Sequence, residues 1–313
     1  MEFYGEIISI GVSASWTICA LCMEYASRHA GSLPVNWIRI LWALVMTSLL
    51  LFFHTGSFLP LEADFDTWFW LSLSGLVGFV FGDICLYSAY VIIGSRFTQL
   101  FMTLAPPITA ITGIFLLDER MGMKATAGML VTVSGIAISI LGSDSSGSGR
   151  KPSIKLPLKG ILLGIGAAIG QGVGIVLSKI GMEAYALSSA SGQTGGADTV
   201  MAFAGSEIRM ITAAVAFAAV LLYKGRIREV RRTFSNKKIF ISIILGTIFG
   251  PFVGVSFSLK ALTLTDSGIA STLTSLAPIM ILLPAWLIQK QKIRKIEILG
   301  AMVSIAGVFL FFM

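Results

Sequence analysis

Ten long apolar stretches follow one another along this chain of 313 residues. They lie at 5–27, 34–53, 67–91, 95–117, 123–142, 159–181, 200–223, 238–262, 267–288 and 296–313. About 20 residues of apolar helix cross the hydrocarbon core of a bilayer, so stretches of this length are typical of membrane spans. Charged residues make up only 12% of the chain, against roughly 25% in ordinary globular proteins. The sequence therefore predicts an all-α integral membrane protein with ten transmembrane helices.

The second half of the chain repeats features of the first half at a constant spacing. A shift of 172 positions superposes Leu104-Ala105-Pro106 on Leu276-Ala277-Pro278. The same shift superposes four pairs of glycines: Gly78 and Gly250, Gly82 and Gly254, Gly128 and Gly300, and Gly135 and Gly307. An odd number of spans in each copy makes the two copies cross the membrane in opposite directions. We therefore predict two inverted five-helix repeats, 1–142 and 159–313, joined by a linker at 143–158.

Lysine and arginine residues gather in alternate loops of this predicted topology. They occur at Arg28, at Arg96, in the segment 150–159, at seven positions in 224–238 and at four in 290–295. Acidic residues such as Glu62 and Asp64 lie in the opposite loops. Because basic loops remain in the cytoplasm, this pattern predicts both termini outside, in the inner (cytoplasmic) membrane. We interpret the net charge of +7 as a topology signal and not as a nucleic-acid site; a role in binding anionic lipid stays open.

The sequence predicts no metal, no cofactor and no disulfide. Cys19, Cys22 and Cys85 all fall inside predicted spans, and an odd number of cysteines gives no disulfide framework. Cys19 and Cys22 have the Cys-x-x-Cys spacing that forms half of a metal motif, but the partner ligands are missing, so packing is the favoured interpretation. The sequence contains no Walker-type phosphate loop that would indicate ATP-driven pumping. Since the amino end is acidic, we expect the first stretch to remain as a span and not to be cleaved as a leader.

Small residues and prolines mark particular spans. Glycines recur every four residues in the third, sixth and eighth stretches, which predicts close helix packing there. Prolines remove a backbone donor and favour helix kinks, so the fourth and ninth stretches are expected to line a polar cavity or to flex. A static kink that only shapes the bundle is the alternative. The expected kinks are at Pro106, Pro107, Pro251, Pro278 and Pro284.

Several runs of residues resemble the EamA domain of the drug/metabolite transporter superfamily. In the first half they are Gly82-Asp83-Ile84-Cys85-Leu86-Tyr87-Ser88-Ala89, Gly94-Ser95, Leu104-Ala105-Pro106 and Leu117-Asp118-Glu119-Arg120. In the second half they are Gly250-Pro251-Phe252-Val253-Gly254-Val255, Gly268-Ile269-Ala270-Ser271-Thr272-Leu273 and Leu276-Ala277-Pro278. The resemblance implies a ten-helix carrier with a central cavity that opens alternately to each side, without ATP, for amino acids, other metabolites or drugs.

Two features depart from that family pattern. Gln291 stands where the repeat would put a second acidic residue like Glu119. Family members are usually drawn with both termini in the cytoplasm, whereas the charges here favour the reverse. The resemblance therefore leaves the orientation open.

Asp83 is the most informative single candidate, because an ionised side chain in the middle of a span is costly without a partner. At helical spacing it shares a face with Tyr87 and Tyr90. Asp83 would bind a cationic group or carry a proton if it serves transport. In a purely structural role it would bond a neighbouring helix.

Uncharged polar and aromatic side chains form further candidates for a solute cavity. Gln99 and Thr103 lie one turn apart and lead into the proline pair. Such groups suit hydrogen bonding to a neutral or zwitterionic solute, although each could bond another helix instead. Besides Asp83, Tyr87 and Tyr90, the candidates are Trp16, Gln99, Thr103, Gln171, Ser256, Thr274 and Ser275.

Four charged residues near span ends are candidates for gates or a charge network: Glu24, Lys179, Arg39 and Arg209. Snorkelling to the lipid headgroups is the favoured alternative for these side chains. Glu207 lies two residues from Arg209, which leaves a local charge network open.

The sequence predicts a secondary transporter of an amino acid-like or drug-like solute across the cytoplasmic membrane, working by alternating access and without catalysis. Proton-coupled export and facilitated diffusion both stay open. The expected partners are the solute, the bilayer and protons, with no nucleic acid, and the oligomeric state is not predicted. The alternative is a membrane-embedded enzyme acting on a lipid, with Asp83 and Glu24 as acid and base. The mirrored repeat argues against it, because catalysis gains nothing from two-sided symmetry.

Overall fold

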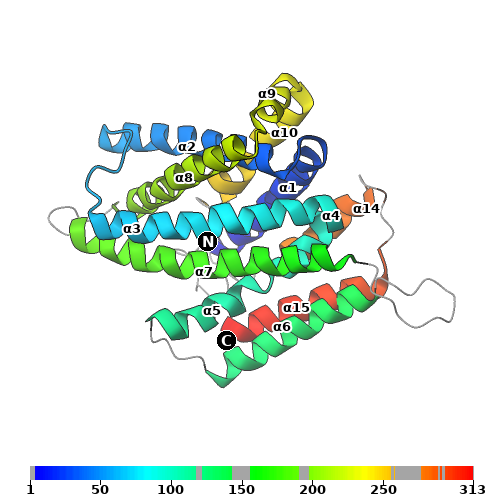
Figure 1. Ribbon diagram of the computed structural model, residues 1–313. Helices are drawn as coiled ribbons and strands as arrows, with labels where there is room; N and C mark the ends of the chain where they lie inside the picture. Colours follow the sequence, from blue (N-terminus) through cyan, green and yellow to red (C-terminus); the bar gives the residue numbers. More distant parts are fainter. Residues whose placement is uncertain are drawn as a thin grey trace.

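The computed structural model describes residues 4–117, 122–142, 156–189, 197–254, 257, 276–287, 290 and 293–312, and every regular element in these ranges is a helix (Figure 1). The first half contains α1 (Tyr4–Ala30), α2 (Ser32–Thr55), α3 (Phe65–Ser74), the π-helix η1 (Gly75–Gly82), α4 (Asp83–Met102), α5 (Ala105–Leu117) and α6 (Met123–Gly142). The second half contains α7 (Leu158–Ser189), α8 (Ala197–Tyr223), α9 (Ile227–Ser235), α10 (Lys237–Thr247), the π-helix η2 (Ile248–Gly254), α13 (Ala277–Met280), α14 (Leu282–Leu287) and α15 (Lys295–Phe312).

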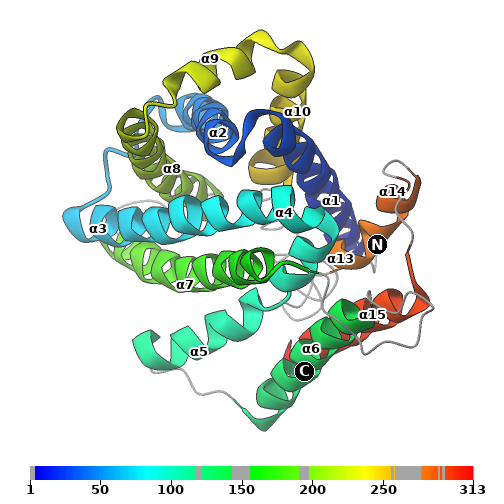
Figure 2. The same cartoon turned by 45° about the vertical axis from the view of Figure 1, so that its right-hand side comes forward.

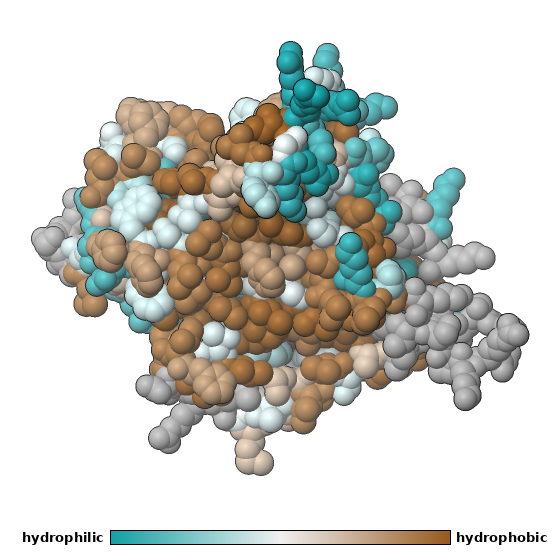
Figure 3. Space-filling model, in the orientation of Figure 1, coloured by the Kyte–Doolittle hydropathy of each residue, from teal (hydrophilic) through white to brown (hydrophobic). Residues whose placement is uncertain are grey.

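Six described helical runs are long and apolar enough to cross a membrane. They are Ile7–Ala30, Ser32–Thr55, Phe65–Met102, Leu158–Ser188, Phe203–Tyr223 and Lys237–Gly254, and three shorter apolar helices accompany them at Ala105–Leu117, Thr126–Ser139 and Ala277–Leu287. The protein is therefore a multi-pass membrane protein. The count of ten spans stays a prediction, because much of the expected ninth span lies outside the described residues. Large apolar side chains such as Phe53 and Phe115, each 80% exposed, contribute to an outer surface that is mostly hydrophobic (Figure 3).

The last helices of the two halves, α6 and α15, lie side by side at one edge of the bundle (Figures 1 and 2). Thr132 and Ser304, which are 172 positions apart, exchange hydrogen bonds: each hydroxyl donates to the other residue's carbonyl oxygen, at 3.4 and 3.3 Å. Further along, Ser139 donates to the carbonyl oxygen of Glu297 at 3.3 Å. Residue numbers thus rise along α6 while they fall along α15, so the two equivalent helices are antiparallel.

The glycines of the repeat explain why α6 and α15 approach so closely. A Cβ added at Gly135 would lie 2.7 Å from the carbonyl oxygen of Gly300, and one at Gly300 would lie 2.7 Å from that of Gly135. Such contacts leave no room for any side chain. Helices in lipid gain little from hydrophobic burial against each other, so close backbone contact at small residues supplies much of their association.

The second helices of the two halves, α2 and α8, also pack against each other in antiparallel fashion. The Trp37 indole donates to the carbonyl oxygen of Ala214 at 3.1 Å, whereas Ser48 donates to Glu207 at 2.5 Å. Each half therefore meets the other through corresponding helices, as expected for a two-fold relation.

The glycine-rich stretches of the third, sixth and eighth predicted spans lie in close helix contacts, as the sequence predicts. A Cβ added at Gly170 of α7 would lie 2.5 Å from the Cα of Gly82 in η1, and one at Gly174 would lie 3.0 Å from the Cα of Gly78. In the other half, a Cβ at Gly250 of η2 would lie 2.5 Å from the Cys19 sulfur of α1. The third helix of each half thus packs against the first helix of the other half.

The two π-helical segments occupy corresponding positions in the halves. Gly82 ends η1 and Gly254 ends η2, and these residues are 172 positions apart. A π-helix carries a wider turn than an α-helix and is frequent at functional sites. The sequence analysis identified the glycines but not this change of helix type. Since η1 ends directly before Asp83, the wider turn positions the main candidate residue.

The helix breaks differ from the predicted proline kinks. Pro106 and Pro107 lie in the first turn of α5, after a turn at Thr103 and Leu104, so the chain breaks between two helices and does not kink one. Pro278 likewise lies in the first turn of α13. The first turn tolerates proline because its N–H groups have no intrahelical partner. Of the remaining prolines, Pro251 lies inside η2 and Pro284 inside α14.

Candidate functional site

Asp83, at the start of α4, forms a buried ion pair with Arg39 of α2. The side chains are 9% and 6% exposed. The Asn36 amide, one turn before Arg39, donates to the backbone carbonyl oxygen of Asp83 at 3.1 Å. Arg39 therefore does not snorkel to the headgroups, because its guanidinium is held inside the protein by the carboxylate. Sequence analysis did not pair these two residues, which are 44 positions apart.

Arg209 of α8, the second helix of the other half, also lies near Asp83. Its guanidinium carbon is 4.4 Å from the ring centroid of Phe79, one turn before Asp83. The guanidinium carbon of Arg39 is 5.3 Å from the ring centroid of Tyr87, one turn after Asp83. Both arginines are close enough to interact electrostatically with the carboxylate. Two guanidinium groups from the two halves thus flank one carboxylate.

The contact between Arg209 and η1 depends on glycine. A Cβ added at Gly78 would lie 3.2 Å from an Nη atom of Arg209, and one at Gly75 would lie 2.6 Å from the Arg209 carbonyl oxygen. The Nε of Arg209 is fully covered and has no hydrogen-bond partner among the described residues. One oxygen of the Glu207 carboxylate accepts the hydrogen bond from Ser48, and its other oxygen has no hydrogen-bond partner among the described residues. The local charge network between Glu207 and Arg209 that the sequence left open is therefore not formed in the described part of the chain.

The predicted aromatic stripe on α4 is buried beside the charges. Tyr87 and Tyr90 are each 2% exposed, and their ring centroids are 5.4 Å apart. Gln99, from the part of α4 beyond Gly94, donates to the Tyr90 hydroxyl at 2.9 Å. The structure therefore brings four candidates together, Asp83, Tyr87, Tyr90 and Gln99, along with Arg39 and Arg209.

Other candidates make different contacts or lie outside the described residues. The Thr103 hydroxyl donates to the carbonyl oxygen of Leu100 in its own helix at 2.7 Å, as in the structural alternative. Trp16 packs against η2, where a Cβ added at Gly254 would lie 3.2 Å from the indole. Gln171 is partly buried on α7, and Lys179 is exposed on the same helix. Ser256, Thr274 and Ser275 lie outside the described residues.

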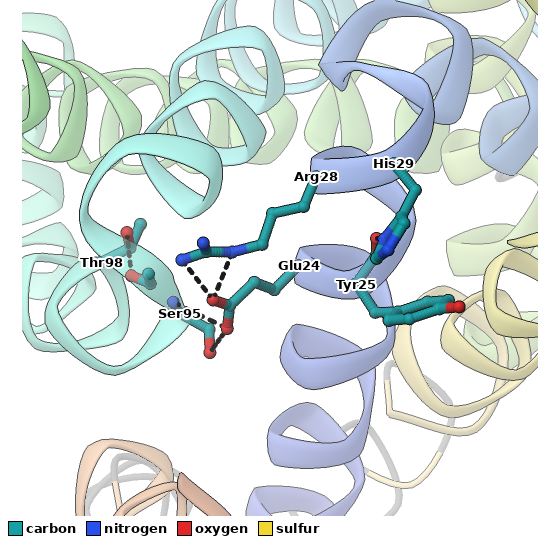
Figure 4. Close-up of polar contacts among 7 residues, drawn as sticks. Glu24, Tyr25, Arg28, His29, Ser95 and Thr98 are labelled. Carbon is teal, nitrogen blue, oxygen red and sulfur yellow. Dashed lines mark hydrogen bonds and ion pairs between the residues drawn. The ribbon is translucent and has the colours of Figure 1, made fainter. Parts of the chain in front are cut away.

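Glu24 of α1 is buried against a break in α4 (Figure 4). At this break Gly94 has φ 81° and ψ 161°, a conformation that other residues rarely adopt. Glu24 accepts hydrogen bonds from the Ser95 backbone N–H at 3.1 Å, from the Ser95 hydroxyl, and from Arg28 Nε at 2.9 Å (Figure 4). The carboxylate therefore satisfies a donor that the break leaves without a helical partner. Like Arg39, Glu24 does not snorkel.

A second ion pair next to this break joins the two halves. Arg96 of α4 lies 3.3 Å from Glu297 of α15, and both side chains are largely buried, at 11% and 4% exposed. The sequence analysis used Arg96 only as a topology signal and did not single out Glu297. Arg96 directly follows Gly94-Ser95, and polar groups commonly bind at a helix break. This position was the sequence signal that could have identified Arg96 as a functional candidate.

The described residues contain no group of three or more His, Cys, Asp or Glu that could hold a metal ion. Cys19, Cys22 and Cys85 are free thiols. The described polar features are instead buried ion pairs at helix breaks, inside an antiparallel helical bundle. In membrane proteins, intramembrane charges at such breaks are characteristic of transporters.

Comparisons with known proteins agree with this class. The model of the EamA-like transporter family matches residues 3–141 and 158–313. The chain therefore belongs to the EamA-like transporter family, whose members are membrane transporters. A solved structure described only as the crystal structure of a protein is similar over 99% of this chain and 96% of its own, with a TM-score of 0.59 and 15% identity. That likeness concerns the fold alone. No curated protein matches the chain.

Proposed function

We propose that this protein is a secondary transporter that moves a small organic metabolite across the cytoplasmic membrane by alternating access. The proposal includes ten transmembrane helices in two inverted repeats, 1–142 and 159–313, with the linker 143–158 between them. The observation that carries it is the cluster of the buried Asp83 and Arg39 with the partly buried Arg209, to which both halves contribute. Charges at such a depth are costly unless they serve a function or are fully paired.

The inverted arrangement is supported by the antiparallel pairing of equivalent helices. If α6 and α15 are copies of one element, their opposite directions mean opposite directions across the bilayer. A site between two such copies is accessible from either side when one copy tilts against the other. The polar breaks before α5 and at Gly94 are suitable places for such a movement.

The charge of the cluster favours a solute with an anionic group. Among the described residues, the cluster combines one carboxylate with two guanidinium groups, so it has an excess positive charge. The carboxylate of an amino acid-like solute would compensate that charge by bonding Arg209. Tyr90, Gln99 and Tyr87 offer neutral hydrogen-bonding and aromatic surface for the rest of the molecule.

The polar contacts at the Gly94 break, a hydrogen bond and an ion pair, are proposed gate contacts. Glu24 with Ser95 joins α1 to α4, and Arg96 with Glu297 joins α4 to α15. Both contacts lie on one side of the Asp83 cluster along α4, since Gly94 to Arg96 follow Asp83 by three helical turns. Their rupture would free the second part of α4 and α5, and their formation would close that end.

Transport by the purified protein in sealed liposomes tests this function. We expect counterflow of at least one carboxylate-bearing metabolite from a panel of amino acids and organic acids, and loss of counterflow with Asp83→Asn. Repeating the assay with and without a pH gradient distinguishes proton-coupled transport from facilitated diffusion. The matched control is Asp66→Asn, which changes an exposed carboxylate at the start of α3. The proposal fails if no solute that stabilises the protein exchanges across the bilayer.

A further inference from the structure

An open, strongly basic hollow lies between α9 and α10. Its volume is about 860 Å³. It is lined by Arg228, Arg231, Arg232, Ser235, Asn236, Lys237 and Lys238. Figure 3 shows hydrophilic residues gathered over α9 and the start of α10, above a mostly hydrophobic surface. Five cationic side chains thus surround one concave surface, and its lining contains no acidic residue.

The nearest carboxylate does not neutralise this hollow. Glu229 lies on α9, but its carboxylate accepts a hydrogen bond from Arg226 Nε at 2.7 Å. Arg226 is not a lining residue. Opposite charges attract, so an anion in the hollow would be attracted by all five cationic side chains.

The hollow lies at the level where helices enter the membrane. Lys237, at its rim, is the first residue of the candidate span Lys237–Gly254. The rings of Phe234 and Phe240 are 5.4 Å apart, and those of Phe240 and Trp42 are 5.9 Å apart. Aromatic side chains gather at the boundary between the hydrocarbon core and the headgroups. Ile227 and Phe234, which are 50% and 44% exposed on α9, add apolar surface beside the charges.

The helix that forms one wall of the hollow is fixed to the bundle. Val230 of α9 is buried in the main hydrophobic core. At the turn between α1 and α2, a Cβ added at Gly31 would lie 3.5 Å from an Nη atom of Arg226, so the start of α9 rests on that turn. The Asn236 side chain accepts a hydrogen bond from the Ile239 N–H at 3.3 Å and caps α10. The basic side chains therefore project from a formed surface and not from a loose loop.

We propose that this hollow binds the headgroup of an anionic phospholipid, whose phosphate oxygens accept hydrogen bonds from the arginine and lysine side chains. Basic pockets at the cytoplasmic ends of membrane helices are suited to such headgroups. A topology signal requires only that basic residues occur in the segment between two spans. Here α9 and the start of α10 also place those residues around one hollow at the membrane interface. The acyl chains would lie along the exposed apolar surface beside α9 and α10.

Native mass spectrometry of the detergent-solubilised protein tests the proposal, with phosphatidylglycerol, cardiolipin and phosphatidylcholine as probes. The hollow variant is Arg231→Gln/Arg232→Gln/Lys238→Gln. The matched control is Lys159→Gln/Lys224→Gln/Lys295→Gln, which removes the same charge from exposed residues outside the hollow. At about 1 kcal/mol for each basic residue near an anionic surface, we expect the hollow variant to bind the anionic lipids on the order of 100-fold more weakly. The control variant should bind them like the wild type.

Further arms of the experiment identify the ligand. For the wild type we expect weak retention of phosphatidylcholine, and weaker retention of the anionic lipids as ionic strength rises. The charge-preserving variant Arg231→Lys/Arg232→Lys should keep the preference for anionic lipid. This variant provides a second test of the hollow if the hollow variant fails to fold. Equal retention by the hollow and control variants would overturn the proposal. Inorganic phosphate that competes as well as the intact lipids would also overturn it, since the ligand would then be a free anion.

Discussion

At the scale of single residues, the buried charges of α2, α4 and α8 constrain the protein most. Asp83 and Arg39 are both covered, and each carries a charge that the other compensates. Removing one partner of a buried pair leaves the other charge without compensation, which costs much more than the pair contributes. The pair therefore holds α2 against α4 whether or not a solute is bound.

Asp83→Asn should lower the free energy of unfolding by about 3 to 5 kcal/mol, because Arg39 is left buried without a counter-charge. The measurement is thermal unfolding of the detergent-solubilised protein. The double variant Asp83→Asn/Arg39→Gln should recover part of the stability, since neither residue then carries a charge, but it should not recover transport. A single variant with wild-type stability would contradict the buried ion pair.

Arg209→Gln should act on the solute more than on stability. Arg209 forms no ion pair among the described residues, so its loss leaves no carboxylate without its principal partner. If Arg209 bonds the anionic group of the solute, the variant should raise KM for a carboxylate-bearing solute by about tenfold or more, which corresponds to about 1.4 kcal/mol. Lys224→Gln, an exposed change directly after α8, is the control. An unchanged KM for Arg209→Gln would remove this residue from the proposed site.

At the scale of helices, the break at Gly94 determines how α4 can contact its neighbours. The φ of 81° turns the chain so that Ser95 donates to Glu24 and Gln99 returns toward Tyr90. An uninterrupted α4 would instead use the Ser95 N–H in its own helix. The break thus connects the proposed gate contacts to the charged cluster.

Gly94→Ala should destabilise the protein by about 1 to 3 kcal/mol, because a Cβ is strained in this backbone conformation. The added Cβ would also lie 3.4 Å from the Glu24 carboxylate. Gly11→Ala in α1 is the matched control, because nothing lies within 4 Å of a Cβ added there and its φ is not positive. Thermal unfolding and counterflow measured on both variants give the comparison. Equal behaviour would show that the break does not need glycine.

At the scale of the whole molecule, the two halves pack against each other through several helices. First and third helices pack across the halves, and second and fifth helices pair with their own counterparts. The reciprocal hydrogen bonds of Thr132 and Ser304 are characteristic of a two-fold axis that passes between them. The contacts between the halves therefore involve corresponding helices of each copy.

Cysteine labelling in whole cells tests the opposite orientation of the halves. Glu62→Cys and Ser235→Cys place one exposed thiol in each of two corresponding loops, between the second and third spans of each half. In a background without Cys19, Cys22 and Cys85, a membrane-impermeant maleimide should label the first site from outside and the second only after permeabilisation. Labelling of both sites from the same side would exclude inverted repeats.

Much of the helical arrangement could be predicted from the sequence. Several apolar stretches match described helices to within a few residues, including 123–142 for α6, because the length of an apolar run reflects the thickness of the hydrocarbon core. However, α7 continues to Ser189, beyond the predicted end at 181, and α9 was not predicted. The repeat spacing identified the glycines that later proved to be contacts. The π-helical form of η1 and η2, and the complete break before Pro106 in place of a kink, could not be predicted, because they depend on which backbone groups find partners in neighbouring helices.

The sequence by itself determined that the chain spans a membrane several times and that its two halves are related, since both properties follow from apolar length and from residue spacing. It also selected Asp83, Tyr87, Tyr90 and Gln99, because polar residues inside apolar helices are few. Only the tertiary structure decided which polar and charged groups meet. Arg39 with Asp83, Glu24 with Ser95, and Arg96 with Glu297 are distant in the sequence, and a partner is chosen by the helix that packs alongside.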